Sequence, residues 1–248
     1  MPLKRIDVLF ENECCLVINK PAGLAVQGGE GVGASLDVLL EAEYVPRPLL
    51  VHRLDKDTSG VILVAKNREA AAWFSALFSG EGAAAGTAAA RVADSVAAAG
   101  EAIGASGRGL LKQYLAVCAG IPQPPEGLIQ ADLEIRGSIK KSETFYRVMG
   151  TLPLAGSLAG RDCSALELEL GTGRMHQIRR HLAHIGHPIL GDDKYGDFAL
   201  NKQLRKAPGL KRLLLHAARL CIAPAPAFPG GIDVSAPLPD YFAPFWPG

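Results

Sequence analysis

Residues 51–66 read VHRLDKDTSGVILVAK and join a densely charged turn to an apolar run. The first part holds one histidine, one arginine, one lysine and two aspartates ahead of a Thr-Ser-Gly sequence. The part that follows, VILVAK, has the aliphatic and β-branched side chains that are typical of a buried strand. The stretch therefore predicts charged side chains at the start of a strand, either as an ordinary polar turn or as a site of chemistry.

Apolar segments on both sides of this stretch predict more strands than helices. Helical spacing of apolar residues predicts helices at residues 36–43, 68–78 and 173–186. Because strands and helices do not alternate regularly, we predict an α+β fold with a mixed, largely antiparallel sheet flanked by helices and loops. Short apolar runs bounded by turn residues predict strands at 7–10, 15–19, 61–66, 110–120, 141–150 and 165–171, and at the end of 212–223.

The length of 248 residues and the hydrophobic content of 48% suit one domain that spans residues 1–248. Residues 80–109 differ from the rest, because 12 of these 30 residues are Ala and seven are Gly. We interpret this segment as an insertion on the surface, with an ordered helical hairpin as the alternative.

Several features disfavour whole classes of protein. The chain has no run of 18 apolar residues, which predicts no transmembrane helix, and its first residues do not resemble a signal peptide. The five cysteines form no C-x-x-C pair and no pattern typical of a disulfide framework. We therefore expect a reduced, cytoplasmic, monomeric protein that does not bind a membrane.

The charge of the chain is unevenly distributed, although its net value is only +1. Residues 136–219 contain 15 Lys and Arg against 7 Asp and Glu, whereas the remainder contains 11 against 18. A basic second half is compatible with a polyanionic partner such as nucleic acid. A basic surface without any partner explains the same numbers.

The predicted helix at residues 173–186 brings basic and apolar side chains together. Ile178, Leu182 and Ile185 form one apolar stripe at helical spacing. Arg179 would point inward from this helix, and a buried arginine needs a carboxylate partner. Such a pair could be structural, or it could tune a catalytic aspartate.

The start of the same helix is a candidate anion site. Arg174 and His176 would lie in its first turn, where free N–H groups and the helix dipole favour negative charge. Four of the six histidines lie between residues 176 and 187, which could indicate a metal site. No H-E-x-x-H arrangement and no nearby cysteine accompanies them, so we favour packing and hydrogen-bonding roles and predict no metal.

A rival enzyme class is suggested by the acidic residues. DKDTS at 55–59 and GDD at 191–193 are similar to two motifs of aspartyl phosphotransferases. That class requires a hydrophobic strand leading into the first aspartate and a regular α/β alternation. This chain has LLVHRL before Asp55 and no such alternation, so we do not favour it.

Five stretches, taken in order, resemble the RluA-type family of RNA pseudouridine synthases. HRLDKDTSG matches the motif H-R-L-D-x-x-T-S-G of that family. GGEGVGASL at 28–36 is similar to the branch that acts on bacterial large-subunit ribosomal RNA. The other similar stretches are NKPAGLAV, KQYLAVCAG, GRMHQIRRHLAHIGHPILGDDKYG and LLLHAARL.

The resemblance implies roles for three residues and no cofactor or metal. Asp55 would be the catalytic aspartate, which either attacks C1′ of the uridine or removes its 2′ proton. Tyr114 would pack on the flipped base and assist removal of the C5 proton. Arg179 would pair with Asp55 and lower its pKa.

The resemblance also implies residues that bind the RNA substrate. Arg53 would take the place of the flipped uridine or contact phosphate, and Ile178 would line the pocket. His52, Arg174 and His176 are the remaining predicted substrate-binding residues, with His52 also positioning the loop. Lys56 and the basic residues of 136–219 would bind phosphates.

Two features depart from the family pattern. Met175 stands where the motif usually has Thr. We also expect the chain to begin at the catalytic domain, without the N-terminal S4 RNA-binding domain of many relatives. We predict a pseudouridine synthase that acts on structured RNA, specifically 23S-type ribosomal RNA. The alternatives are transfer RNA as the substrate and a catalytically silent RNA-binding factor.

Overall fold

Two units make up the chain: Met1–Lys112 with Ala217–Pro237, called unit 1, and Gln113–His216 with Leu238–Gly248, called unit 2. The computed structural model describes residues 6–29, 33–79, 109–135, 137–154, 158, 160–206 and 209–247. The predicted insertion at 80–109 lies outside these residues except for Gly109. The prediction of a single domain stays a prediction.

The central strand of unit 1 is buried on both faces. All seven residues of β4 (Ser59–Ala65) are buried, as expected for its continuous apolar sequence. Phe74 and Leu77 of helix α2 (Arg68–Ser79) pack in the same hydrophobic cluster as Val61 and Leu63 of β4. The neighbouring strands run in the order β1 (Val8–Glu11), β2 (Cys15–Lys20), β4 and β11 (Leu215–Ile222), with β3 (Leu49–Leu50) beside β4 and β12 (Ile232–Ser235) beside β11.

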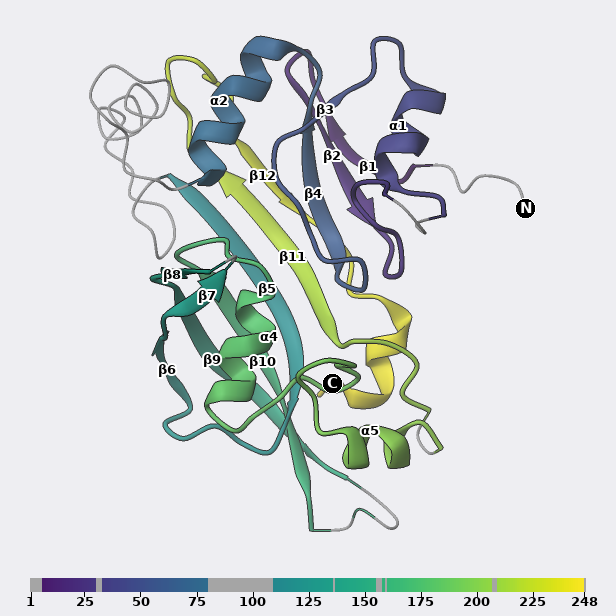
Figure 1. The fold of residues 1–248 in the computed structure, drawn as a ribbon, viewed down its shortest axis with the longest axis vertical. Helices are drawn as coiled ribbons and strands as arrows, with labels where there is room; N and C mark the ends of the chain where they lie inside the picture. The colour runs from purple at the N-terminus through teal and green to yellow at the C-terminus, as the bar shows by residue number, and fades with distance from the viewer. Residues whose placement is uncertain are drawn as a thin grey trace. The chain divides into compact units, whose positions relative to one another are not determined.

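Helix α1 (Leu36–Glu43) also belongs to unit 1 and has the predicted bounds. Leu36, Leu39 and Leu40 are its buried side chains, which gives the helix one apolar face. Figure 1 shows α1 and α2 as separate helices connected to the strands of this unit.

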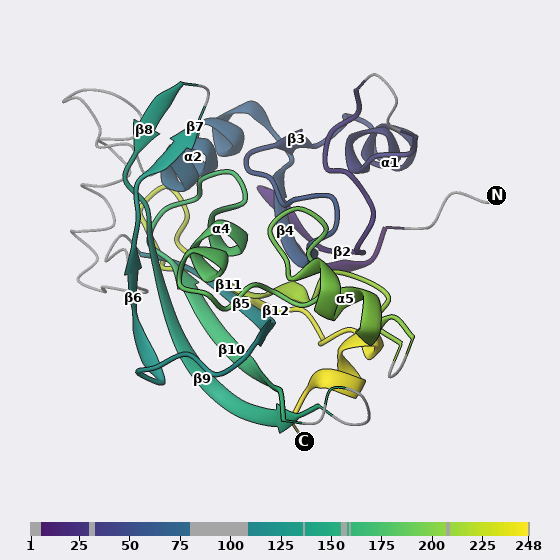
Figure 2. The ribbon, with the colours of Figure 1, turned by 60° about the horizontal axis from the view of Figure 1, so that its bottom comes forward.

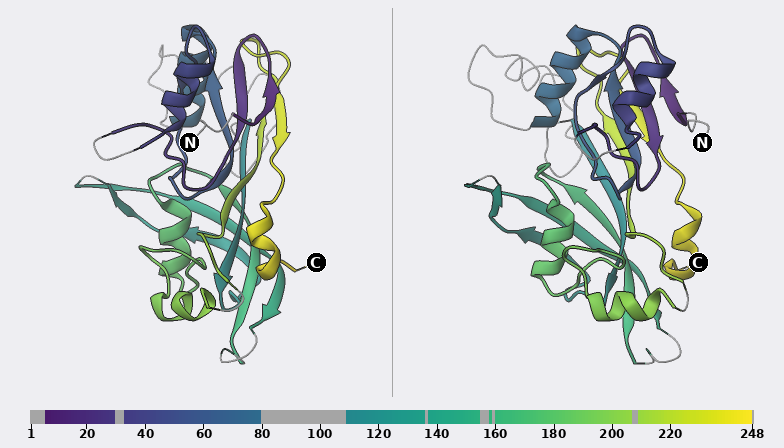
Figure 3. Two further views of the ribbon diagram at one scale, coloured as in Figure 1. Left: turned by 90° about the vertical axis from the view of Figure 1, so that its right-hand side faces the viewer. Right: turned by 45° about the vertical axis from the view of Figure 1, so that its right-hand side comes forward.

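Unit 2 contains an antiparallel sheet with a helix on one face. Its strands follow the order β5 (Leu110–Ala119), β10 (Asp162–Leu170), β9 (Glu143–Pro153) and β6 (Glu126–Gln130). Figures 2 and 3 show helix α4 (Gln177–His184) on the concave side of the curved strands β9 and β10. A separate two-stranded sheet, β7 (Leu133–Ile135) and β8 (Ser138–Lys140), forms a hairpin next to α4 (Figure 1). The remaining elements are α5 (Phe198–Leu204) and the 3-10 helix η2 (Asp240–Phe245).

The predicted α+β fold with a largely antiparallel sheet is confirmed. The prediction placed the start of the helix at 173–186 too early. His176 adopts a left-handed backbone with φ of 54°, so α4 begins only at Gln177. Arg174 and His176 therefore precede the helix and are not in its first turn. The short elements β3, β6, β7, β8, β12 and α5 were not predicted, since they lack enough residues for a periodic pattern.

Within the described residues, no helix is both long and apolar enough to span a membrane.

Candidate functional site

The loop that carries Asp55 is fixed by its own backbone. The N–H of Thr58 donates to the carbonyl oxygen of Asp55 at 3.2 Å, which closes a turn. Leu54 and Thr58 are buried on either side, whereas the Asp55 side chain is half-buried. The carboxylate thus lies on a fixed turn, close enough to the surface to meet a ligand.

The backbone conformation at residue 60 explains why the charged stretch ends in glycine. Its φ is +107°, and a Cβ added there would lie 2.1 Å from the carbonyl oxygen of Ala217. Only glycine combines this backbone conformation with such a close approach of another chain segment. The loop therefore enters β4 at a point where β4 lies directly against Ala217.

His52 has a positioning role in the structure. Its Nε2 accepts a hydrogen bond from the N–H of Leu63 at 2.9 Å, and its ring stacks on Phe78 with centroids 4.0 Å apart. Burial lowers the pKa of His52 to about 3, and the positive charge of Lys112 adds to this effect. The neutral ring therefore joins the loop before Asp55 to strand β4 and helix α2.

Lys20, to which no role was predicted, holds the other side of the same loop. Its side chain is fully buried, and Nζ donates to the carbonyl oxygens of Pro21 at 3.1 Å, Leu24 at 2.9 Å and Lys56 at 3.1 Å. Burial lowers the pKa of Lys20 to about 8, opposed by the negative charges of Asp57 and Asp55. A lysine at the end of an apolar strand and ahead of Pro-Ala-Gly was the sequence signal for this contact.

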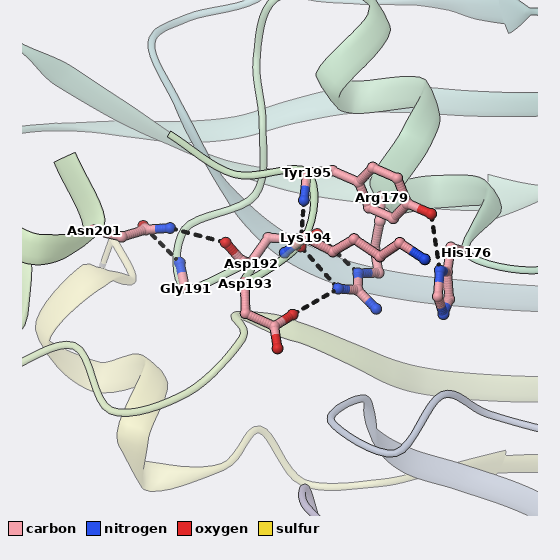
Figure 4. A network of polar contacts seen from close by, with 8 residues as sticks. All are labelled: His176, Arg179, Gly191, Asp192, Asp193, Lys194, Tyr195 and Asn201. Atoms are coloured by element: carbon pink, nitrogen blue, oxygen red, sulfur yellow. Dashed lines mark hydrogen bonds and ion pairs between the residues drawn. The ribbon is translucent and has the colours of Figure 1, made fainter. Parts of the chain in front are cut away.

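Unit 2 holds Arg179 in a buried ion pair with Asp192. Nε donates to Oδ2 and Nη2 donates to Oδ1, both at 2.8 Å, while Nη2 also lies 3.1 Å from Oδ1 of Asp193 (Figure 4). The Arg179 side chain is 5% exposed and that of Asp192 is 0% exposed. The prediction that Arg179 points inward and has a carboxylate partner is confirmed.

Asp192 is ionised because several donors converge on it. Burial by itself raises the pKa of Asp192, but hydrogen bonds from Arg179 and from the N–H groups of Tyr195 and Lys194 outweigh it, so the pKa is lowered. Those two N–H groups donate to Oδ1 at 2.9 and 2.8 Å. The Asn201 amide donates to the carbonyl oxygen of Asp192 at 3.0 Å, which fixes the backbone of the same turn.

Tyr195 connects this ion pair to the turn before α4. Its hydroxyl lies 3.0 Å from Nδ1 of His176, and its ring centroid is 5.4 Å from Cζ of Arg179. Figure 4 shows the three side chains next to one another. The contact supports the left-handed conformation of His176, which a residue other than glycine adopts at a cost in free energy.

Gln177 anchors the first turn of α4. Its Oε1 accepts from the N–H of Arg174 at 3.0 Å and from Oγ1 of Thr172 at 2.7 Å. Its Nε2 donates to the carbonyl oxygen of Glu143 at 2.8 Å and to Oγ1 of Thr144 at 3.1 Å. All four hydrogen bonds of this buried amide are made, so the start of α4 has a defined place against β9.

The predicted site residues divide between the units. Unit 1 contains His52, Arg53 and Asp55, with Arg53 exposed. Unit 2 contains Tyr114, Arg174, His176, Ile178 and Arg179. The ion pair between Asp55 and Arg179 joins residues of different units and stays a prediction.

Two of the unit 2 residues contact the hydrophobic core. Ile178 is 4% exposed and belongs to the core cluster, and the half-buried Tyr114 on β5 packs against that cluster. Arg174 is half-buried, and its Nε has no hydrogen-bond partner among the described residues.

Residues 15–184 match the model of the RNA pseudouridylate synthase family, a range that contains Asp55, Tyr114 and Arg179. The chain belongs to this family. Two solved structures have the same fold: Human RNA Pseudouridylate Synthase Domain Containing 4, with a TM-score of 0.64 and 24% identity, and Domain Containing 1, with 0.65 and 23%. The matches cover 96% of this chain in both cases, and 90% and 86% of the human chains.

Bacterial members of the pseudouridylate synthase family are more similar in sequence. Ribosomal large subunit pseudouridine synthase C of Haemophilus influenzae is 35% identical over 221 residues, which is 85% of this chain and 59% of that protein. The synthase C of Escherichia coli is 35% identical over 231 residues, or 86% of this chain and 60% of that protein. The chain thus spans about three-fifths of the length of these two relatives.

A metal site is not evident in the described part of the chain, where no three His, Cys, Asp or Glu side chains gather in a suitable group.

Proposed function

We propose that this protein is an RNA pseudouridine synthase, an isomerase that converts uridine to pseudouridine in structured RNA. The observation that carries the proposal is the family match over residues 15–184. Asp55 on its fixed turn and Arg179 in its buried network supply the carboxylate and the cation that the reaction needs.

In the proposed reaction, Asp55 either attacks C1′ of the uridine or removes its 2′ proton, and the N1–C1′ bond breaks. The released uracil turns while it is held in the site. C5 then forms the new bond to C1′, either as the bond between Asp55 and C1′ breaks or, on the second route, as the 2′ carbon regains its proton. The proton on C5 is removed with the assistance of Tyr114, and N1 gains a proton. The product is an isomer of the substrate, so the atoms balance without a cofactor or a co-reactant.

The proposal brings both units into one catalytic domain, in which Arg179 pairs with Asp55. Arg53 is exposed on the Asp55 loop, which suits a side chain that replaces the flipped base or contacts phosphate. Ile178, Arg174 and His176 contribute to uridine binding from unit 2.

The proposed substrate is 23S-type ribosomal RNA, with transfer RNA as the alternative. The relatives named ribosomal large subunit pseudouridine synthase support this choice. We further propose that the protein is a cytoplasmic monomer. A silent RNA-binding factor would need neither Asp55 on a fixed turn nor a buried Arg179.

The function is tested by mapping pseudouridine in total RNA from cells with and without this protein. We expect the loss of pseudouridine at defined sites of large-subunit ribosomal RNA, and losses confined to transfer RNA would select the alternative substrate. Complementation with Asp55→Asn should not restore the modification, whereas the matched variant Asp57→Asn in the same loop should. Restoration by Asp55→Asn would contradict the proposed catalytic role.

A further inference from the structure

The β7–β8 hairpin and Lys141, the residue that follows it, present basic and apolar side chains to solvent, together with the acidic side chain of Glu134. Lys140 and Lys141 are exposed, and Ile139 is 73% exposed. Neither lysine forms an ion pair with another described residue of the chain. The hairpin forms its own two-stranded sheet, so its position depends on what holds its two ends.

One stripe of helix α4 faces the chain where the hairpin ends. Gln177 and His181 are four residues apart and therefore lie on the same face of the helix. Gln177 contacts Glu143 and Thr144 at the start of β9, and Nε2 of His181 lies 2.9 Å from Oγ of Ser142. The helix is thus joined at two successive turns to residues 142–144.

Ser142 connects both ends of the hairpin to this helix. Its Oγ lies 2.5 Å from the carbonyl oxygen of Ala131, and the N–H of Ala131 donates to the carbonyl oxygen of Ser142 at 3.3 Å. The Ser142 hydroxyl has one proton, and the short contact indicates that this proton is donated to the carbonyl oxygen of Ala131. Oγ of Ser142 therefore accepts a hydrogen bond from the Nε2–H of His181. His181 therefore donates to a hydroxyl that joins residue 131 to residue 142.

His181 makes this contact at a cost in free energy. Its side chain is fully buried, and Nδ1, which then carries no proton, has no hydrogen-bond partner among the described residues. Burial lowers the pKa of His181, which keeps the ring neutral although the backbone of Ala131 acts in the opposite direction. An apolar side chain would leave no buried acceptor unpaired here, but it could not donate a hydrogen bond to Ser142.

A second contact joins the same helix to the hairpin. Nη1 of Arg180 donates to the carbonyl oxygen of Glu134 in β7 at 3.1 Å. Arg180 is next to His181 in sequence. One turn of α4 therefore contacts both Ser142, where the hairpin ends, and β7, the first strand of the hairpin. Figure 2 shows the hairpin and α4 side by side.

We propose that His181 and Ser142 are positioning residues that lock the β7–β8 hairpin to α4, so that Lys140, Lys141 and Arg180 bind RNA phosphates as one surface. This inference rests on the proposed function, because it takes RNA as the ligand. Phosphate contacts by lysine contribute affinity whatever the RNA sequence, and they do so best when their spacing is fixed.

The test is a double-mutant comparison of RNA affinity. The probe is unmodified large-subunit ribosomal RNA transcribed in vitro, and the dissociation constant is measured by filter binding. Lys140→Ala with Lys141→Ala should weaken binding about tenfold, and Ser142→Ala should cause a loss of similar size. All three changes together should weaken binding no further than Ser142→Ala alone, because the lysines no longer contribute once the hairpin is not held against α4. Losses that multiply to about a hundredfold would show that the lysines act independently of Ser142 and would overturn the proposal.

Two matched variants separate positioning from a general loss of stability. Ser142→Thr keeps the hydroxyl and should restore affinity. Ser164→Ala removes another fully buried hydroxyl of unit 2, which donates to the carbonyl oxygen of Gly120, and should leave affinity unchanged. If Ser164→Ala weakens RNA binding as much as Ser142→Ala does, the effect of Ser142 is one of stability and the proposal is wrong.

Kinetics and hydrogen exchange complete the experiment. Ser142→Ala should raise KM for the RNA and leave kcat within about twofold, because it does not touch the reacting atoms. It should also speed amide exchange in residues 133–140. Unchanged exchange there would contradict the proposal that Ser142 holds the hairpin against α4. The measurements of affinity and amide exchange do not require turnover. An inactive wild-type protein would therefore overturn the proposed function, while this inference could still be tested.

Discussion

Among the described residues, each unit buries one Lys or Arg side chain, and the two cations have different partners. In unit 1, Lys20 donates to three neutral carbonyl oxygens of Pro21, Leu24 and Lys56. In unit 2, Arg179 forms two parallel hydrogen bonds to the carboxylate of Asp192. The first cation holds a backbone loop, and the second is itself held by a side chain.

The difference follows from the shapes and charges of the groups. The compact ammonium group has three donors that can reach carbonyls in different directions, whereas the planar guanidinium matches a carboxylate. Neutral carbonyls only partly replace water around a charge, and the pKa of Lys20 is accordingly lowered to about 8. A carboxylate compensates the charge, and the pKa of Asp192 is lowered by that pairing.

The comparison predicts the largest loss of stability for Asp192→Asn. This change leaves Arg179 buried without its main counter-charge, which should lower the free energy of unfolding by about 3–5 kcal/mol. Chemical denaturation measures the change. Asp193→Asn is the matched control, since the Asp193 side chain is 73% exposed and its loss should cost less than about 1 kcal/mol. Equal effects of the two substitutions would mean that burial does not decide the strength of the pair.

A smaller loss is expected for Lys20→Met, which removes the charge together with its hydrogen bonds. Three backbone carbonyls lose a donor, but no buried charge is left uncompensated, so we expect a decrease of about 2 kcal/mol. Activity should fall as well, because the carbonyl of Lys56 directly follows Asp55. Denaturation and a pseudouridine assay measure the two effects. A loss as large as that of Asp192→Asn would remove the distinction between the two buried cations.

The last effect, which is similar in size to that of Lys20→Met, concerns pH and His52 in unit 1. The pKa of His52 is 6.5 in the unfolded chain and about 3 in the folded one. Between these values only the unfolded state binds the proton, so stability falls as pH decreases below 6.5, by about 2 kcal/mol at pH 5. Denaturation curves at pH 5 and pH 7 measure the difference. His52→Gln, which can still accept from Leu63, should reduce this difference, and an unchanged difference would assign the acid sensitivity to another group.

The amino-acid sequence alone was sufficient to predict most of the longer helices and strands and the family. The apolar run after Asp55 predicts β4, the spacing of leucines predicts α1 with its observed bounds, and helical spacing predicts a buried Arg179. These predictions succeed because they depend on side chains that are close in sequence and on periods of two or 3.6 residues.

The partners of the buried groups required the tertiary structure. No periodic pattern indicates that Arg179 pairs with Asp192, that Lys20 contacts the carbonyl of Lys56, or that a Cβ at Gly60 would meet Ala217. These contacts join residues 13 to 157 positions apart, and their energies depend on distance, burial and direction. Sequence motifs therefore located the charged residues, and folding decided which of them meet.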